Sequence, residues 1–307
     1  MIRGKVKWTI IGAMLILLTF YGISMAADTD IVNAASYLKL GVGARFLAMG
    51  GASTAAVDDA TAVAWNVAGL TRVKSASVAS MYSAGDQTMD RRHNFLALAS
   101  SVKGLGSFGI GWINAGVVDI PRYNDQDVAQ GTFNSNENAF LLSYGASFKP
   151  VRLGAGVKIL HQKIDPDSTE TKMGFGGLDI GALADPVEAV TVGLSVQNIL
   201  GKIADAKVPT ILRVGTAVRL LPSNDLLVAV DLSKAFVDLR GKTAALHIGA
   251  EYWAADLIGF RLGFSSEKQF AAGIGVKMSN VSVDYAYTVQ RDGLEPDVHY
   301  VSICASF

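Results

Sequence analysis

From about residue 75 to residue 307, the chain alternates large apolar residues with small or polar ones. In residues 139–149, for example, Phe140, Leu142 and Tyr144 fall on one side of an extended strand, and the residues between them fall on the other. The same pattern recurs in residues 151–163, 257–265 and 280–290. Because successive side chains of a β-strand point to opposite faces, this period predicts a sheet with one large apolar face and one small or polar face.

The character of the second face decides between two classes of all-β protein. A soluble sandwich also alternates, but its outward faces carry long charged side chains. Here the second face is mostly Gly, Ser, Ala and Thr, only 18% of the residues are charged, and the mean hydropathy is positive. Large apolar side chains suit contact with lipid, and small ones suit a crowded interior. We therefore favour an antiparallel transmembrane β-barrel over the alternative, a sandwich.

The alternating segments number about fourteen, and most have the 8–13 residues that suit a tilted membrane strand. After residue 25 no run of 18 uncharged apolar residues occurs, which excludes helical spans. We expect the strands near residues 76–83, 92–101, 105–115, 138–149, 151–163, 174–184, 188–198, 209–220, 224–234, 243–254, 257–265, 268–278, 280–290 and 298–307.

The expected connections alternate in length. Those around Lys103 and Pro150, and at residues 185–186, 222–223, 254–255 and 279, are short, whereas most of the others are longer and more polar. Outer-membrane barrels have short periplasmic turns and longer external loops, so both chain ends are expected in the periplasm. The longest loop, residues 116–137, is rich in Asn and Asp; it lacks the spacing of a calcium site. A solvated loop, a cation site and a surface for a protein partner remain open for it.

The N-terminus has the pattern of a secretory signal peptide. Arg3, Lys5 and Lys7 precede an apolar run over residues 8–23, and the small residues Ser24 and Ala26 predict cleavage after residue 26. An uncleaved anchor is the alternative. Cleavage removes three of the 27 Lys and Arg residues and none of the 27 acidic ones, which leaves a net charge of about −3. A net negative charge does not favour binding to nucleic acid. From the signal peptide and the strand pattern we expect export to the bacterial outer membrane, with its lipid as a partner.

Residues 41–70 do not alternate and are rich in Gly and Ala. Four glycines within residues 41–51 interrupt any long helix, but residues 44–49 have room for one or two helical turns. A second short helix is expected over residues 60–66, capped by Asp58 or Asp59. Helices this short need surrounding walls to be stable. We therefore divide the chain into a signal peptide (1–26), a small helical and loop plug (27–74) and a barrel (75–307).

Two stretches, LKLGVGARFLAMGGA at residues 38–52 and AVDDATAVAWNVAGL at residues 56–70, resemble the N-terminal signature of the PorV/PorQ group. That group is a branch of the FadL-like outer-membrane barrels. One departure is Val67, which stands where the family usually has Pro. The resemblance implies a fourteen-stranded barrel with an N-terminal hatch. It also implies a role in protein secretion like that of type IX components, with FadL-like transport of long-chain fatty acids or other hydrophobic compounds as the alternative.

The candidate site residues fall in three groups. In the plug, Arg45 with Asp58 and Asp59 forms either a gate latch or a structural cap, and Trp65 and Asn66 serve packing or a ligand. Phe307, at the end of the last strand, resembles the signal that barrel-assembly machinery reads. Charges on the small face are expected in the lumen, as a network that braces the plug or as a polar path for a solute or for the head group of an acid. They include Arg152, Lys158, Asp179, Arg213, Arg219, Asp231, Glu251, Arg261, Lys277 and Asp284.

The sequence gives little support to an enzyme. The four histidines, His93, His161, His247 and His299, lie on separate segments without metal-ligand spacing. No G-x-S-x-G motif and no phosphate-binding glycine loop occurs. We therefore expect no catalytic residue, no metal and no cofactor, and a role in secretion or transport with either a protein or an apolar small molecule as partner.

Overall fold

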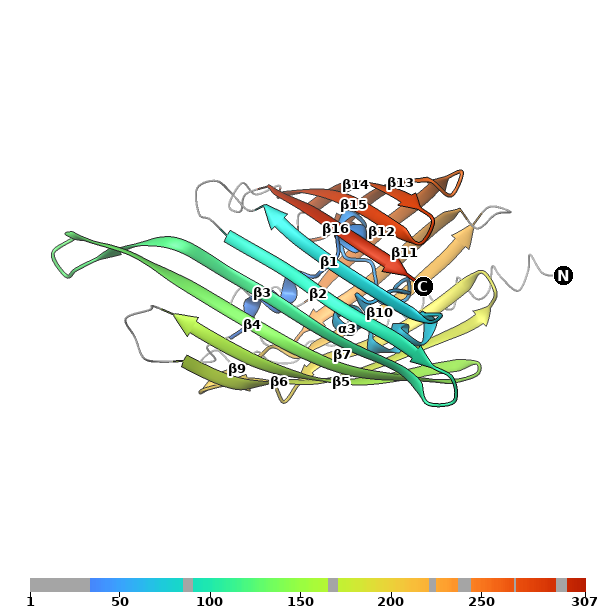
Figure 1. Ribbon diagram of the computed structural model, residues 1–307, viewed down its shortest axis with the longest axis horizontal. Helices are drawn as coiled ribbons and strands as arrows, with labels where there is room; N and C mark the ends of the chain where they lie inside the picture. The colour runs from blue at the N-terminus through green and yellow to red at the C-terminus, as the bar shows by residue number, and fades with distance from the viewer. Residues whose placement is uncertain are drawn as a thin grey trace.

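The computed structural model describes residues 34–84, 91–164, 171–220, 225–236, 244–267, 269–290 and 297–307. Fourteen antiparallel strands form a closed barrel (Figure 1), in which β1 pairs with β16 and every other strand pairs with its neighbours along the chain. The fourteen strands are β1 (Ala76–Ala84), β2 (Arg91–Val102), β3 (Gly106–Tyr123), β4 (Ala129–Phe148), β5 (Val151–Ile164), β6 (Thr171–Val187), β7 (Val190–Ile199), β10 (Ile211–Leu220), β11 (Leu226–Ala235), β12 (Ala244–Ala254), β13 (Ile258–Ser265), β14 (Gln269–Met278), β15 (Val281–Gln290) and β16 (Val298–Ser306).

The predicted barrel and its fourteen strands are confirmed. Large apolar side chains such as Phe140, Leu142 and Leu262 point outward, with 50%, 58% and 68% of their surface exposed. Two-residue strands β8 (Lys202–Ile203) and β9 (Ala206–Lys207) were not expected from the sequence. They form a small hairpin that pairs with β6 at Gly174 and Phe175, between β7 and β10 in the chain.

The prediction of a polar loop at residues 116–137 is wrong in part, because most of these residues form strands. β3 and β4 continue as a two-stranded hairpin that extends well beyond the other strands (Figure 1). Pairs such as Ile120 with Phe133 and Pro121 with Thr132 hold it together, and the turn lies near residues 124–128. The apolar alternation weakens here while the strand pairing continues. The sequence pattern therefore marked the end of the apolar outer face and missed the end of the strands.

The described residues 34–73 lie inside the barrel, where Figure 1 shows them as blue segments behind the front strands. Helix α2 (Ala44–Ala48) contacts β13–β16, and α3 (Ala62–Trp65) contacts β3 and β4. Two 3₁₀ helices, η2 (Ser36–Lys39) and η3 (Val67–Arg72), precede and follow them, and η3 packs against β2–β6. We call residues 34–73 the plug.

The second helix of the plug differs from the expectation. It is only four residues long, and the residue at its N-cap is Thr61, so neither Asp58 nor Asp59 occupies that position. Asp59 lies two residues earlier and accepts hydrogen bonds from the Thr61 amide (2.8 Å) and hydroxyl (2.5 Å). The Gly-rich chain around it is shaped by contacts with the wall, which local helix signals do not encode.

Three predictions fall outside the described residues: the signal peptide at residues 1–26, its cleavage site, and the short turn at residues 222–223. Among the residues that the structure describes, no helix has the length and apolar character needed to cross a membrane.

Candidate functional site

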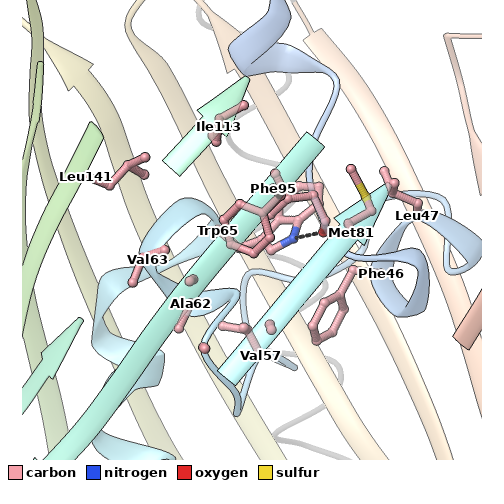
Figure 2. Packing of buried hydrophobic residues seen from close by; sticks show 14 of the residues in the cluster. Phe46, Leu47, Val57, Ala62, Val63, Trp65, Met81, Phe95, Ile113 and Leu141 are labelled. Carbon is pink, nitrogen blue, oxygen red and sulfur yellow. Dashed lines mark hydrogen bonds between the residues drawn. The ribbon is translucent and has the colours of Figure 1, made fainter. Parts of the chain in front are cut away.

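Trp65 lies at the centre of the plug. Its indole Nε1 donates a hydrogen bond to the Val42 carbonyl (2.8 Å), and its ring meets Phe46 edge-on, with 6.4 Å between the ring centres. Figure 2 shows the apolar side chains of the plug gathered with Met81 and Phe95 from the wall, and these residues form one buried cluster. At Gly41, which has a φ of 78°, an added Cβ would lie 2.5 Å from the Trp65 ring. Only glycine fits this turn.

Glycines of the barrel wall make room for the plug backbone. A Cβ on Gly263 would lie 2.1 Å from the Gly50 nitrogen, and a Cβ on Gly193 would lie 2.6 Å from the Thr54 carbonyl oxygen. These distances are far shorter than any van der Waals contact. The small residues that the sequence placed on the inner face therefore let plug backbone and wall backbone come into direct contact.

Arg45 joins the plug to the wall through a chain of charges. Its Nε and Nη2 each lie 2.8 Å from a carboxylate oxygen of Glu251 on β12, and its Nη1 lies 2.6 Å from Asp58 and 3.6 Å from Asp59. Burial lowers the pKa of the guanidinium, but the carboxylates of Asp58 and Glu251 outweigh it and raise that pKa well above its usual value. Arg45 therefore stays charged and tethers the plug.

The charges continue along the wall. Glu251 also accepts a hydrogen bond from Arg261 Nε (2.7 Å), and Arg261 Nη1 lies 2.7 Å from Asp284 Oδ1. On β10, Arg219 Nη2 lies 3.4 Å from Asp58. Each buried charge in this group has an opposite charge beside it, which offsets the cost of removing it from water.

Polar side chains of the wall also hold the plug backbone directly. Asp231 Oδ2 on β11 accepts hydrogen bonds from the amides of Ser53 (2.9 Å) and Thr54 (2.8 Å). His93 and His247 each bond a plug carbonyl at 2.8 Å, those of Gly41 and Gly50 respectively. A carbonyl only accepts, so each of these ring nitrogens carries a proton. The sequence singled out neither histidine, although each stands at an inward position of its strand.

Near the turn between β6 and β7, Arg72 and Arg152 share one carboxylate. Arg72 Nη2 lies 3.2 Å from Asp185, and Arg152 forms an ion pair with the same group. Arg72 also donates to the Ala55 carbonyl (2.9 Å) and to Thr191 (2.6 Å). Of these three charged residues only Arg152 was a candidate from the sequence, since Arg72 precedes the first strand and Asp185 lies in an expected turn. Asn66 caps η3 through Ala68 and donates to the Thr54 carbonyl, so it holds the plug together internally.

A small cavity lies between the plug and the barrel wall. It has room for about one water molecule, and with the space open to solvent it measures about 390 Å³. Side chains from η2, α3, β3, β5, β7 and β10 line it. Its apolar part includes Tyr37, Leu38, Val42, Trp65 and Ile113, and its polar part consists of Lys158, Gln197, Asn198 and Arg213.

Most polar groups of the cavity are already bonded. Lys158 Nζ lies 2.7 Å from Asp179 and donates to Asn198 Oδ1 at 2.6 Å. Gln197 donates to the carbonyls of Ala64 and Trp65. Neither Gln197 nor Asn198 was a sequence candidate. Asn198 has a φ of 60°, beside an irregularity in the β6–β7 pairing, and strand alternation alone does not reveal this.

Arg213 differs from the other cavity residues. It is 7% exposed, and its guanidinium lies 5.1 Å from the centre of the Trp65 ring. Arg213 and Asp231 were both expected on the inner face from the sequence. Although the two residues lie on adjacent strands, no ion pair joins them in the part of the chain that the structure describes. Arg213 Nε and Nη1 and Asp231 Oδ1 are buried without a hydrogen-bond partner among the described residues.

Phe307 takes part in closing the barrel through its backbone. It exchanges hydrogen bonds with Ala76 at the start of β1, at 2.8 and 3.3 Å, and its side chain is 64% exposed. The described residues contain no cluster of three or more His, Cys, Asp or Glu side chains arranged to hold a metal ion.

No family model and no curated protein matches this sequence. Solved structures do match. The toluene transporter TodX of Pseudomonas putida is 12% identical, with a TM-score of 0.64 over 92% of this chain and 100% of that chain. This chain has the fold of the FadL-like outer-membrane barrels.

Two further matches agree with this fold. The toluene transporter TbuX of Ralstonia pickettii is 15% identical, with a TM-score of 0.63 over 87% of this chain and 98% of that chain. A FadL homologue of Pseudomonas aeruginosa is 12% identical, with a TM-score of 0.54 over 83% of this chain and 96% of that chain. These similar structures belong to transport channels. At such identities they show the shared fold and leave the solute of this chain to its own residues.

Proposed function

We propose that this protein is an outer-membrane channel that carries small hydrophobic compounds past an internal plug. The observation that carries the proposal is the cavity between the plug and the wall of a FadL-like barrel, with Trp65, Ile113, Val42, Leu38 and Tyr37 on its apolar side. Ligand sites of barrels lie in their mouths and are mostly apolar with a few polar groups, as here. The toluene transporters of the same fold support this solute class.

In this proposal the cavity is the first binding site, and the plug controls passage beyond it. The cavity is much smaller than an aromatic ring needs, and plug and wall are in direct backbone contact at Gly263. A solute therefore enters only when the segment around Tyr37 and Leu38 moves away from Ile113. The ion pairs of Arg45 and Arg72 then hold the rest of the plug during this movement.

Overfilling the cavity tests the proposal. Ile113→Trp places a larger ring in the cavity, whereas Ile110→Trp makes the same change on the outer face of the same strand, where Ile110 is 52% exposed. We expect Ile113→Trp to lower the uptake rate of labelled toluene about tenfold, because the indole occupies the solute's place. Ile110→Trp should leave uptake unchanged. The measurement uses intact cells of a host without a channel of this fold.

Two controls make the result decisive. Heat-modifiability on gels confirms that each variant forms a folded barrel in the outer membrane. Ile113→Ala enlarges the cavity and should raise uptake, so the proposal does not depend on the overpacked variant folding. If cells with folded wild-type protein take up toluene no faster than cells with empty vector, the proposal is wrong.

A second candidate function is a role in secretion, as the PorV/PorQ resemblance implies. The observation that favours it is the β3–β4 hairpin, which extends beyond the barrel and exposes Tyr123 and Val128. In this alternative the hairpin holds an exported protein. Removing residues 118–134 would then release that protein from the cell surface and leave toluene uptake as it was.

A further inference from the structure

Four asparagines meet on the outer surface of the barrel, at the base of the β3–β4 hairpin. Asn94 on β2, Asn114 on β3, and Asn136 and Asn138 on β4 stand at outward positions, with Asn94 opposite Asn114 and Asn114 opposite Asn138. Asn94 Nδ2 donates to Asn114 Oδ1 (3.2 Å), and Asn114 Nδ2 donates to Asn136 Oδ1 (3.0 Å) and Asn138 Oδ1 (3.1 Å). Asn138 Nδ2 also donates to Asn136 Oδ1 (2.9 Å). We call these four residues the asparagine patch.

The asparagine patch lies at the edge of the apolar outer surface. The next outward residues along the same strands are Leu96, Trp112 and Phe140, of which Leu96 and Phe140 are exposed. Trp112 Nε1 donates to Asn138 Oδ1 (3.0 Å), and tryptophan is typical of the level where hydrocarbon meets the lipid head groups. Because an amide that faces hydrocarbon is costly, the patch belongs at the head-group level, just beyond the apolar belt.

The change from apolar to amide side chains is local. The turn between β13 and β14 lies at the same end of the barrel as the β3–β4 hairpin. The outward residues beside that turn are Phe264 and Phe270, whose ring centres are 5.2 Å apart. There the apolar surface continues to the ends of the strands, whereas on β2–β4 it stops at the asparagine patch. The patch therefore needs an explanation beyond the general girdle of a barrel.

Basic side chains flank the asparagine patch on both sides. Arg92 is the outward residue beyond the patch on β2, and His161 and Lys163 on β5 pair with its two β4 residues. Arg92 and Lys163 are exposed. Glu137 stands between the two β4 asparagines but points into the barrel, where it accepts a hydrogen bond from Gln162 (2.9 Å). Among the described outward positions in the barrel part of β2–β5 none is acidic, so the surface around the patch is positively charged.

The kinds of side chain follow a definite order along this surface. From the apolar belt towards the end of the barrel, apolar residues give way to amides, and the amides to cations. A side-chain amide both donates and accepts hydrogen bonds, as a sugar hydroxyl does. Arg and Lys bind phosphate, and basic clusters beside a membrane surface attract anionic head groups. A lipid whose acyl chains are joined to phosphorylated sugars presents three complementary groups in the same order.

We infer that the asparagine patch, together with Arg92, His161 and Lys163, binds a phosphorylated glycolipid of the outer leaflet. The acyl chains lie against Leu96 and Phe140, the sugar hydroxyls bond the amides, and Arg92 and Lys163 hold phosphate groups. No covalent bond is made or broken. The bound lipid secures the barrel wall at the point where the β3–β4 hairpin leaves it. This site lies on the outside of the barrel, so it depends on the membrane location of the protein and not on the cavity or its solute.

Native mass spectrometry of the purified full-length protein in detergent tests the inference. The probes are lipid A, its dephosphorylated form, and phosphatidylglycerol, which is anionic and has no sugar ring. Each is added at the same concentration, and the fraction of barrels that retain one lipid is measured. We expect wild type to retain lipid A at least about tenfold more than either of the other lipids, because the site uses both sugar and phosphate.

Matched variants separate the site from a general effect of charge. Arg92→Gln with Lys163→Gln should lower the retention of lipid A to about that of the dephosphorylated form. The control, Lys202→Gln with Lys207→Gln, makes the same change in net charge on exposed residues of β8 and β9 and should retain lipid A as wild type does. Asn114→Leu removes the central amide of the patch and should lower the retention of lipid A about fivefold.

Heat-modifiability confirms that each variant is folded, and the comparison of the three lipids on wild type decides the question even if a variant does not fold. Equal retention of the three lipids by wild type overturns the inference. Equal retention of lipid A by the Arg92 and Lys163 variant and by its control also overturns it. A protein that occupies this surface in membrane extracts, and that lipid A does not displace, would be a different occupant and would overturn it as well. Because the site is separate from the cavity, its failure leaves the proposed function as it stands.

Discussion

Gly263 shows how tightly the inner face of the barrel is fitted to the plug. The position where its Cβ would stand is 2.1 Å from the Gly50 nitrogen and 2.3 Å from the Met49 carbonyl carbon. Both neighbours are backbone atoms, so no side-chain rotation can relieve the contact. The plug itself, or strand β13, would have to shift. Glycine is therefore required at this position because the backbone of β13 lies so close to the plug backbone. The conformation of Gly263 itself does not require it.

The corresponding prediction is that Gly263→Val displaces the plug. Overpacking a filled interior costs about 1–3 kcal/mol, and here the added atoms meet backbone. We expect limited proteolysis to cut the plug at least about fivefold faster, with the barrel still folded. The matched change Leu262→Val, on the outer face of the same strand, should leave the cleavage rate as in wild type. Equal rates in the two variants would show that the plug tolerates the added volume.

At the scale of elements, the sequence predicted the strand segments in which every second residue is large and apolar. Apart from the outer ends of β3 and β4, the barrel strands lie close to their expected ranges, because each faces an apolar exterior on alternate residues. The β3–β4 extension was missed because its strands are held by backbone pairing and by polar contacts such as the Asp119 amide with Asn134 Oδ1 (3.0 Å), which carry no apolar signal.

The same reasoning explains which residues of the site could be predicted from the sequence and which could not. The alternation of side chains along each strand was enough to place Glu251, which pairs with Arg45, on the inner face. It also placed Lys158 and Asp179 there. It could not supply strand register at the bulge between β6 and β7, so Gln197 and Asn198 were missed as cavity residues. Nor could it show that Arg213 and Asp231 do not pair, since that depends on how the plug amides engage Asp231.

The extension is expected to be dispensable for folding. Within the described residues, β2 pairs with β3 only as far as Val117, and β5 pairs with β4 only as far as Ser135, so the hairpin beyond them adds no contact to the barrel wall. Replacing residues 118–134 with a short Gly-Ser turn should leave the heat-modifiability temperature within about 3 °C of wild type. Removing residues 107–109 from the barrel part of β3 serves as the control that should prevent folding. A large loss of stability in the hairpin variant would mean that the extension contacts another part of the chain.

For the whole molecule, the important feature is that the plug is tethered on several sides of a closed wall. Glu251 on β12 holds Arg45, Asp231 on β11 holds two amides, Asp185 on β6 holds Arg72, and His93 on β2 holds a carbonyl. A closed barrel has no free edge that could open to relieve a strained plug. Opening a path therefore requires some of these tethers to release while others remain.

The tethers on β11 and β12 give the last prediction. Glu251→Gln combined with Asp231→Asn removes both negative charges while keeping the shapes of the side chains. Loss of Glu251 takes one carboxylate from both Arg45 and Arg261, which keep Asp58 and Asp284, and removing one partner of a buried charge pair costs up to about 3–5 kcal/mol. The plug should then leave its closed position, and the ion conductance of single barrels in planar lipid bilayers should rise about tenfold above the low wild-type level.

A matched control removes two acidic groups that do not touch the plug. Glu188 and Asp205 are exposed, so Glu188→Gln with Asp205→Asn makes the same change in net charge and should conduct as wild type does. If the Glu251 and Asp231 variant is folded and its conductance equals that of the control, apolar packing around Trp65 holds the plug without these charges. Conductance that rises only in the first variant would instead establish that the closed state depends on the charge pairs, because packing around Trp65 is the same in both proteins.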